Sequence, residues 1–383
     1  MEFSESELQK ELRGLTQKFV ASTMAPKVNE DEKQEVFRKE WISQLGDLGL
    51  TGIPVEEKWG GAGLGYQDYV VTLEEIAKVS ASYAISVAVT GLAQVILAQW
   101  GSDDQKKRFI PPLAQGKAIG SFSLSEPGSG SDSGALITQA KRQGSEYRLN
   151  GTKLWVTQAD SADLLLVMAR TSGEGNRGIS TFILEKGMPG LKMGKKEEKM
   201  GLNSSHTMEV ILDDVKVPET HRIGNEGDGF KIAMSALDSG RITIAATALG
   251  VAKGALDVAL AHSKQREQFG KPIAEFQGVS FMLADMQTHI DAAELLIQKA
   301  AWLKDNQKPF SLQASEAKVF ATDMTMKVTT DAVQILGGSG YTREFPVERY
   351  MREAKVLQIV EGTNQIQRMI IGKLMTRNEE KVT

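Results

Sequence analysis

Hydrophobic residues recur at helical spacing near the N-terminus, and this character continues to about residue 118. The first apolar face consists of Leu8, Leu12, Leu15 and Phe19. Steps of four and three predict an amphipathic helix. Residues 69–100 are apolar and rich in Ala and Val, so we expect one or two buried helices there. The segment W-G-G-A-G-L-G, residues 59–65, lies between the first helix and this apolar segment and predicts a loop.

The pattern changes over residues 119–226, where short β-prone segments are bounded by Gly, Ser, Asp or Pro. The strand candidates are residues 164–169, 179–184 and 208–217. Asn150-Gly151 lies between two further β-prone runs and predicts a hairpin turn. Because no helical segment separates these strands, we expect an antiparallel sheet or small barrel rather than a βαβ unit.

Helical spacing returns from residue 227. Steps of four and three relate Val279, Leu283, Met286, Ile290, Ala293, Ile297 and Ala300. This 3.5-residue repeat is typical of long helices packed nearly parallel or antiparallel, as in a four-helix bundle. The sequence therefore predicts an α+β protein with an N-terminal α-helical domain (1–118), a middle antiparallel β domain, either small barrel or sandwich (119–226), and a C-terminal helical bundle (227–383).

Composition excludes several classes of function. The chain of 383 residues is 41% hydrophobic and 25% charged, which is typical of a globular protein with two or three domains. A net charge of −4 argues against a nucleic-acid-binding surface. The absence of cysteine excludes disulfides, zinc-thiolate sites, iron–sulfur clusters and cysteine nucleophiles. The four histidines are scattered and predict no metal site.

The start of the chain, M-E-F-S-E-S-E-L, is acidic, so it resembles neither a secretory signal nor an Arg-rich transit peptide. No apolar run in the sequence approaches membrane-spanning length. We therefore expect a cytoplasmic protein without membrane contacts.

The most informative segment is V-L-Q-I-V-E-G-T-N-Q-I-Q-R, residues 356–368. Gly362 predicts a helix break and Thr363 an N-cap for the helix that follows. The buried face expected for that helix comprises Ile366, Met369, Ile370 and Leu374.

Glu361 stands directly before this glycine, beside Ile359 and Val360. Desolvation by these neighbours would raise the pKa of Glu361 toward the range useful for proton abstraction. The alternative is an ordinary first-turn glutamate favoured by the helix dipole, and this segment alone favours that alternative.

Two glycine-rich loops offer backbone N–H groups that can approach a phosphate or planar ring closely. The first is S-E-P-G-S-G-S-D-S-G at residues 125–134, and the second is Q-I-L-G-G-S-G-Y at residues 334–341. The first lacks the spacing G-x-G-x-x-G and a following helix, which excludes a Rossmann dinucleotide site. Taken alone, either loop is more simply a turn.

Five motifs occur together in the order and spacing of the acyl-CoA dehydrogenase family, which the whole chain resembles. They are S-L-S-E-P-G-S-G-S-D, L-W-V-T, R-E-Q-F-G-K-P-I-A-E-F-Q, D-A-V-Q-I-L-G-G-S-G-Y and I-V-E-G-T-N-Q-I-Q-R. The segment L-D-S-G-R-I-T-I-A-A-T-A-L-G-V-A is most similar to the short-chain (butyryl-type) branch. The resemblance implies a homotetramer, a dimer of dimers, with one FAD per subunit.

The implied reaction is FAD-dependent α,β-dehydrogenation of acyl-CoA thioesters to trans-2-enoyl-CoA. Glu361 would abstract the α-proton, FAD N5 would accept the β-hydride, and electrons would pass to electron-transfer flavoprotein. The thioester oxygen would accept from the Glu361 N–H and from a ribityl hydroxyl. The side chains contain no hydride acceptor, so a cofactor is required in any case. Alternatives are an oxygen-reactive flavin oxidase or monooxygenase of the same fold, or a catalytically silent oligomeric binding protein.

The resemblance also implies residue roles. Those lining the flavin and thioester are Phe122, Leu124, Ser125, Gly130 and Ser131. Ser125 and Thr157 would bond the isoalloxazine edge, while Trp155, followed by Val156, would cover the ring face away from substrate. The remaining FAD contacts would be Arg266 at the pyrophosphate with Gln268 and Phe269 beside it, Gln277, Gln334, Gly337 and Gly338 at the adenine half from a neighbouring subunit, and Thr363 and Gln365. Substrate contacts would be Ser131, Asp238, Arg241 and Gly362.

Two positions depart from the pattern of this family, and a third excludes the base of another branch. Val360 stands where a Tyr is usual, which would widen or reshape the acyl pocket and leaves butyryl specificity open. Asn203 stands where an Arg is common. Another branch places its base near position 240, which is Gly240 here, so Glu361 has no rival. Chain length, branching, pathway and electron acceptor stay open.

Overall fold

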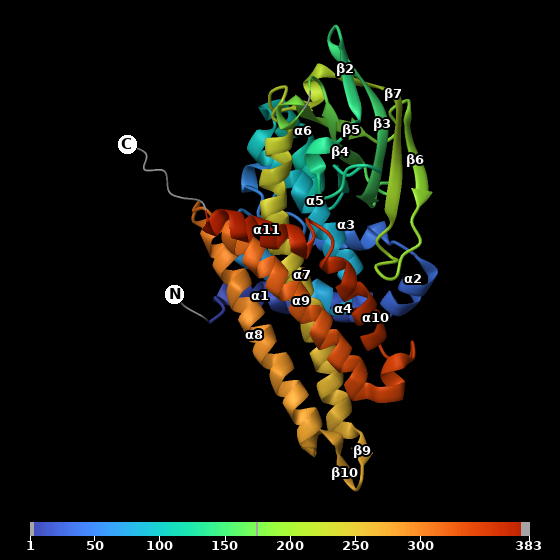
Figure 1. Ribbon diagram of the computed structural model, residues 1–383, viewed down its shortest axis with the longest axis vertical. Helices are drawn as coiled ribbons and strands as arrows, with labels where there is room; N and C mark the ends of the chain where they lie inside the picture. The colour runs from blue at the N-terminus through green and yellow to red at the C-terminus, as the bar shows by residue number, and fades with distance from the viewer. Residues whose placement is uncertain (1–3, 174, 377–383) are drawn as a thin grey trace.

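The computed structural model describes residues 4–173 and 175–376, which form a helical N-terminal part, a β-sheet and a second helical part (Figure 1). The N-terminal helices are α1 (Glu7–Phe19), α2 (Val28–Gln34), α3 (Lys39–Asp47), α4 (Tyr66–Val79), α5 (Ala81–Trp100) and α6 (Asp103–Ala114). The strands are β1 (Gly120–Ser123), β2 (Gln139–Gln143), β3 (Glu146–Thr157), β4 (Leu164–Arg170), β5 (Ile179–Glu185), β6 (Leu191–Lys196), β7 (Thr207–Pro218) and β8 (Arg222–Ile223). The C-terminal elements are α7 (Gly229–Gln265), the short strands β9 (Glu267–Gln268) and β10 (Lys271–Pro272), α8 (Gln277–Asp305), α9 (Ser311–Leu336), α10 (Val347–Leu357) and α11 (Asn364–Met375).

The long apolar segment near the N-terminus is two helices, α4 and α5, which meet at Ser80. The extended backbone of Ser80 ends α4, and its hydroxyl accepts from the N–H of Tyr83 to cap α5. By length and composition, α5 and α7 could each cross a membrane, so the expectation that no apolar run reaches that length is wrong. Within the protein, 94% of the apolar window of α5 and 72% of that of α7 are buried, as expected for core helices.

The sheet runs in the order β6-β7-β3-β2-β4-β5-β8, with β1 added beside β4. Most neighbouring strands are antiparallel, as the short β segments predict. The exception is β4, which pairs in parallel with β1 and, at one residue pair, with β2. Parallel neighbours need a long crossover, and the β2–β3 segment of the chain provides one between β1 and β4.

The hairpin predicted at Asn150-Gly151 is wrong. Both residues lie within the continuous strand β3, and the turn that joins β2 to β3 is at Gly144-Ser145. At position 150 the register with β7 shifts, and the Asn150 side chain accepts from the N–H of Asp214 at 2.9 Å. Pairing with β7 on both sides of this irregularity keeps the strand extended, which outweighs the local turn preference.

Helices α7, α8 and α9 pack against one another below the sheet, with α4 also against α7 (Figure 1). The predicted 3.5-residue repeat is confirmed for α8, since Met286, Ile290 and Ala293 are buried and the repeat continues through Ile297 and Ala300. Helix α7 is about 55 Å long at about 1.5 Å per residue. It extends from the sheet to the β9–β10 hairpin at the opposite end of the molecule.

The face expected to be buried on α11 is wrong. Met369 is 68% exposed and Leu374 is also exposed, whereas Asn364 and Gln367 are buried. The Asn364 side chain donates hydrogen bonds to Thr322 and Asp323 of α9. Polar contacts rather than apolar spacing therefore determine which side of α11 packs against α9.

Candidate active site

Glu361 and Gly362 form a sharp turn between α10 and α11. Their φ angles are 54° and 86°, in the left-handed region. This conformation strains the backbone of Glu361 but not that of Gly362, which has no Cβ. Thr363 precedes the first residue of α11, and its hydroxyl accepts from the N–H of Ile366 at 3.3 Å, which confirms the predicted N-cap.

The carboxyl group of Glu361 lies against α7. A Cβ atom placed on Gly240 would be 2.6 Å from Glu361 Oε2 and 3.3 Å from Cδ2 of Leu92 on α5. Oε2 is buried and has no hydrogen-bond partner among the described residues. Burial raises the pKa of Glu361 to about 7, although the cations of Arg241 and Lys318 oppose the rise. The desolvation expected from the sequence is therefore present, and it comes mainly from tertiary contacts.

The backbone of the turn is held through its carbonyl groups. Gln367 Nε2 donates to the carbonyls of Glu361 and Gly362 at 3.1 and 2.9 Å, and Lys318 Nζ donates to that of Gly362 at 2.9 Å. The N–H of Glu361 has no acceptor within the described ranges. It is therefore available to a ligand. Sequence reasoning missed Lys318, although its step of four from Ala314 on a buried face of α9 could have indicated it.

A buried ion pair anchors the first glycine-rich loop to β3. Lys153 is 0% exposed, and its Nζ lies 2.7 Å from Glu126 Oε1 and 3.1 Å from the Leu124 carbonyl oxygen. Burial acts to raise the pKa of Glu126, but Lys153 and two backbone donors hold it below its usual range. The sequence analysis also missed this pair. It fixes the loop residues beside the end of β3.

The end of β3 carries an exposed aromatic side chain. A register shift between Lys153 and Val156 places Trp155 at φ 61°, and its side chain is 59% exposed. Val156 is buried, so only its backbone can meet a ligand. The Ser125 carbonyl accepts from the N–H of Leu154 at 2.9 Å, which brings the Ser125 loop alongside.

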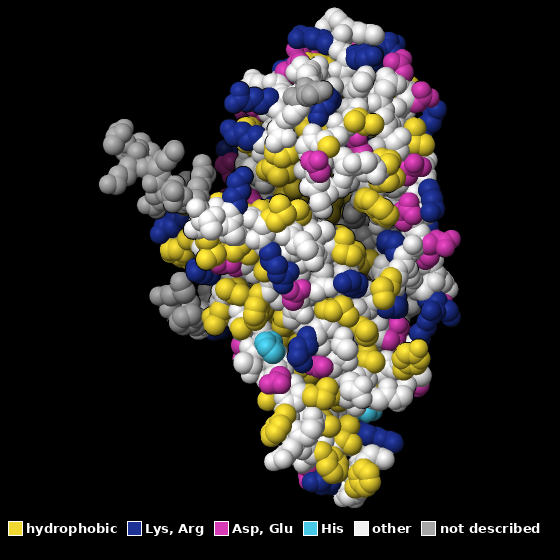
Figure 2. All heavy atoms as spheres, viewed as in Figure 1, with side chains coloured by type: hydrophobic (Ala, Val, Ile, Leu, Met, Phe, Trp, Pro, Cys, Tyr) yellow, Lys and Arg dark blue, Asp and Glu magenta, His cyan; other side chains and the backbone are white. Residues whose placement is uncertain are grey.

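These features fit a planar cofactor. An exposed indole can stack on a ring system. Ser125, whose carbonyl bonds to the neighbouring Leu154, and Thr157, two residues further along β3, carry hydroxyls that could serve as polar partners. Nothing lies within 4 Å of a Cβ placed on Gly130, so the loop is open where a ligand would approach. Figure 2 shows a hollow on this face between the strands and the helices below.

The pair predicted to bind the CoA portion is only partly at the surface. Arg241 is buried and forms an ion pair with Asp238, and its NH1 is 3.5 Å from Ser315 Oγ. The Arg241 charge acts on Glu361, so the structure brings this residue to the carboxyl group. Asp238 also accepts from Ser311 Oγ at 3.0 Å.

A separate group of predicted cofactor residues lies at the far end of the helices. Arg266 follows Gly240 by about 40 Å along α7 and its continuation, at about 1.5 Å per residue. Phe269 at the tip of the β9–β10 hairpin is 95% exposed. The exposed members of this distal group are Arg266, Gln268, Phe269, Gln277, Gln334, Gly337 and Gly338. One subunit therefore does not bring them to Ser125 and Trp155 (Figure 1).

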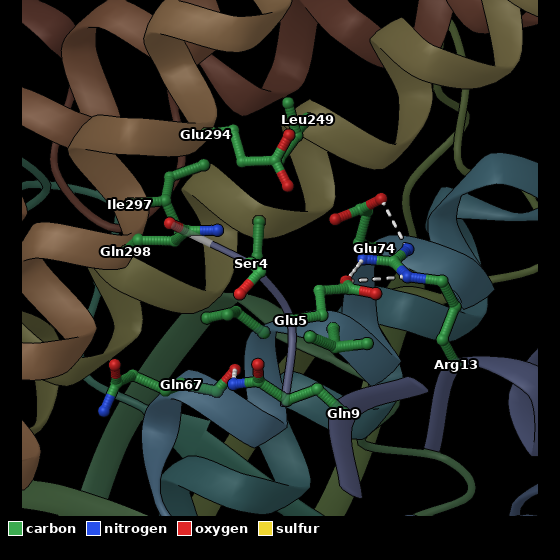
Figure 3. Close-up of a pocket in the computed structure, with 13 residues that line it drawn as sticks. Ser4, Glu5, Gln9, Arg13, Gln67, Glu74, Leu249, Glu294, Ile297 and Gln298 are labelled. Carbon is green, nitrogen blue, oxygen red and sulfur yellow. Dashed lines mark hydrogen bonds and ion pairs between the residues drawn. The ribbon is translucent and has the colours of Figure 1, made fainter. Parts of the chain in front are cut away.

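A cavity of about 50 Å³ lies elsewhere, among α1, α4, α7 and α8 (Figure 3). Arg13 and Glu74, 2.9 Å apart, form part of its wall. Another lining residue, Leu249, is more than two turns along α7 from Gly240. The cavity holds about three to five water molecules, so it is too small for an acyl-CoA.

The chain matches the three domains of one enzyme family. Residues 6–117, 121–215 and 227–376 match the N-terminal, middle and C-terminal domains of acyl-CoA dehydrogenase. The fold and site define an oxidoreductase acting on CH–CH bonds. The chain belongs to the acyl-CoA dehydrogenase family, and its cofactor is FAD.

Several relatives are similar over nearly their whole length. A short-chain-specific acyl-CoA dehydrogenase of Megasphaera elsdenii is 46% identical, covering 98% of this chain and 100% of the relative. The solved butyryl-CoA dehydrogenase of that organism is 45% identical, with a TM-score of 0.97 over 98% of this chain and 100% of that one. A structure from a study of the electron transferring flavoprotein of Acidaminococcus fermentans is 44% identical, with a TM-score of 0.98 over 99% of this chain and 100% of that one.

Proposed function

We propose that this chain dehydrogenates short-chain acyl-CoA thioesters and that Glu361 is its catalytic base. The observation that carries the assignment is the buried Oε2 of Glu361, which has no partner among the described residues and rests against Gly240. A carboxylate that is held without a partner is free to take a proton from a ligand. The similarity to short-chain-specific and butyryl-CoA dehydrogenases supports the substrate class.

The environment of Glu361 suits removal of a weakly acidic α-proton. With a pKa of about 7, the carboxylate is a stronger base than an exposed glutamate and is still ionised in a large fraction of molecules near neutral pH. The unpaired N–H of Glu361 would donate to the thioester oxygen and stabilise the charge that develops there. Bound against Trp155, with Ser125 and Thr157 at its edge, FAD would supply the hydride acceptor that the side chains lack.

The separation between the two groups of cofactor residues supports a site shared between subunits. The Ser125 loop and Trp155 would hold the flavin ring, while Arg266 and the distal group would contact the FAD of a neighbouring subunit. The exposure of Phe269 at the hairpin tip supports burial of this end in an assembly. We infer a homotetramer, a dimer of dimers; sedimentation that shows only monomer at micromolar concentration would contradict it.

Acyl chain length depends on the walls beside Glu361. Val360 packs partly buried against the main core, and Leu92 approaches Gly240 from α5. A Val in place of a Tyr removes an aromatic ring from this wall, so the preferred chain can be longer or more branched than butyryl. The backbone N–H of Asn203 donates to Glu32 at 2.7 Å.

Electron-transfer flavoprotein is the proposed electron acceptor, supported by the similarity to the Acidaminococcus structure. We also propose a cytoplasmic location, supported by the similarity to acyl-CoA dehydrogenases of bacteria. An oxygen-reactive oxidase of the same fold is the alternative, and reoxidation by air distinguishes the two.

The deciding experiment is an anaerobic screen of straight and branched acyl-CoA substrates that monitors bleaching of the flavin absorbance. We expect bleaching with short acyl chains, slow reoxidation by oxygen and fast reoxidation by electron-transfer flavoprotein. A colourless protein after gentle purification, or no bleaching with any acyl-CoA, would contradict the proposed function.

A further inference from the structure

A lysine lies beneath the turn that carries Glu361. Lys318 is fully buried on α9, and its Nζ donates at 2.9 Å to the Gly362 carbonyl and at 2.9 Å to Asn364 Oδ1. Asn364 is itself fixed, because its Nδ2 donates to Thr322 and Asp323 at 2.9 and 2.7 Å. The ammonium group therefore joins α9 to the last residue of the turn and the first residue of α11.

Lys318 forms no ion pair with any described residue, although a buried cation is costly unless an opposite charge compensates it. Two carboxylates act on it, those of Glu361 and Asp323. Asp323 is already engaged by Arg368 at 2.6 Å. Glu361 forms no ion pair among the described residues, so its charge and that of Lys318 can partly balance one another, together with the charge of Arg241.

The other groups around Glu361 can be named element by element. Helix α7 contributes Arg241, whose charge is balanced by Asp238. Helix α5 contributes the apolar Leu92. Helix α9 contributes Lys318, with Asp323 one turn further along. Burial raises the pKa of Glu361 to about 7 and lowers that of Lys318 to about 7, and the opposite charges partly reverse both shifts. Lys318 therefore carries its charge below and around the pH at which Glu361 titrates.

We propose that Lys318 is a positioning residue for Glu361, which fixes the turn through the Gly362 carbonyl and favours the ionised carboxylate by its charge. The proposal rests on the proposed role of Glu361 as base. Lys318 would therefore have two separable roles. Its hydrogen bond fixes the backbone of the turn, and its positive charge favours the ionised form of Glu361.

Two substitutions separate these tasks. Lys318→Gln keeps an N–H donor and removes the charge, whereas Lys318→Met removes both. We expect the rising limb of the profile of kcat/KM against pH to move to higher pH by about one unit in both variants. At a pH below this limb, kcat/KM should therefore fall about tenfold. Lys318→Met should also lose activity on the plateau, where Lys318→Gln retains more.

The control is Lys253→Met, which removes a largely buried lysine of α7 that pairs with Glu74 and Glu294. In Lys253→Met, the rising limb of kcat/KM against pH should lie at the same pH as in the unsubstituted protein. An unchanged limb in folded Lys318→Gln would overturn the proposal, and a shift in Lys253→Met of the same size would make it nonspecific.

A second measurement is independent of turnover. Infrared difference titration, with Glu361→Gln as the reference, follows protonation of this carboxyl group directly. Lys318→Gln should raise the pH at which it titrates; the same titration with and without Lys318 would overturn the proposal even if no acyl-CoA is oxidised. Absence of bleaching in the unsubstituted protein would instead contradict the proposed function. If Lys318→Met does not fold, Lys318→Gln carries both measurements.

Discussion

The carboxyl group of Glu361 occupies the space that a side chain at position 240 would need, since a Cβ on Gly240 would be 2.6 Å from Glu361 Oε2. Two segments far apart in the sequence therefore fit together at one point. The missing side chain of Gly240 admits the carboxyl group to a buried place on α7. Burial there is also what raises the pKa of Glu361.

Gly240→Ala tests this fit. The added methyl group would force the carboxyl group to move, and a misplacement of about 1 Å costs on the order of 10²-fold in rate. We expect kcat for acyl-CoA dehydrogenation to fall by about that factor while FAD binding persists. Gly14→Ala on α1 is the matched control, because nothing lies within 4 Å of a Cβ there. Equal kcat in the two variants would show that Glu361 does not need this space.

Glu361→Gln should keep the fold, the flavin absorbance and acyl-CoA binding, since Gln is nearly isosteric. Turnover should fall by about 10² to 10⁴-fold or more, because a positioned base contributes that much. Glu361→Asp should retain part of the activity. Stopped-flow bleaching under anaerobic conditions is the measurement. A near-normal bleaching rate in Glu361→Gln would place the base elsewhere.

The same substitution should change how stability depends on pH. The folded-state pKa of Glu361 is raised to about 7 from 4.5, so between these values the folded state binds a proton that the unfolded state does not. Its contribution to the free energy of unfolding therefore falls as pH rises through this window. We expect Glu361→Gln to unfold at higher urea concentration than the unsubstituted protein at pH 8, with no such gain at pH 4. Parallel curves at both pH values would contradict the raised pKa.

Arg266→Ala should weaken retention of FAD during gel filtration, because a charge-assisted phosphate contact is roughly twice as strong as a neutral hydrogen bond. Lys264→Ala, at an exposed position on the last turn of α7, is the control for loss of a positive charge. Equal flavin content in the two variants would remove Arg266 from the cofactor site.

Helix spacing and motif order were enough to predict the three-part fold, because long periodic segments such as α8 determine their own buried face. The error at Asn150-Gly151 arose because a turn preference is local, whereas pairing of β3 with β7 joins residues far apart in sequence. The error at α11 has a similar origin. Its apolar spacing could not reveal that Asn364 meets Thr322 across the helix interface.

The site shows the same difference between features that are local in sequence and features that depend on the fold. Glu361 and the two loops were found from their own sequence motifs. The buried Lys153–Glu126 pair was not, because each residue is ordinary in its own segment and only the fold places them 2.7 Å apart. Gly240 was noted as a position without a rival base, but a sequence does not show which side chain will fill the space above a glycine.

Helix α7 carries Gly240 in its first half and ends at the start of the distal group, so each subunit would take part in its own reaction at one end and bind a neighbour's cofactor at the other. Two variants that are each defective in a different residue of the site could then complement one another. In a mixed pair of Arg266→Ala and Glu361→Gln subunits, one site collects both lesions and the other receives neither. Refolding the two variants together should therefore give more activity than either variant shows alone, because the mixed pair contains one intact site.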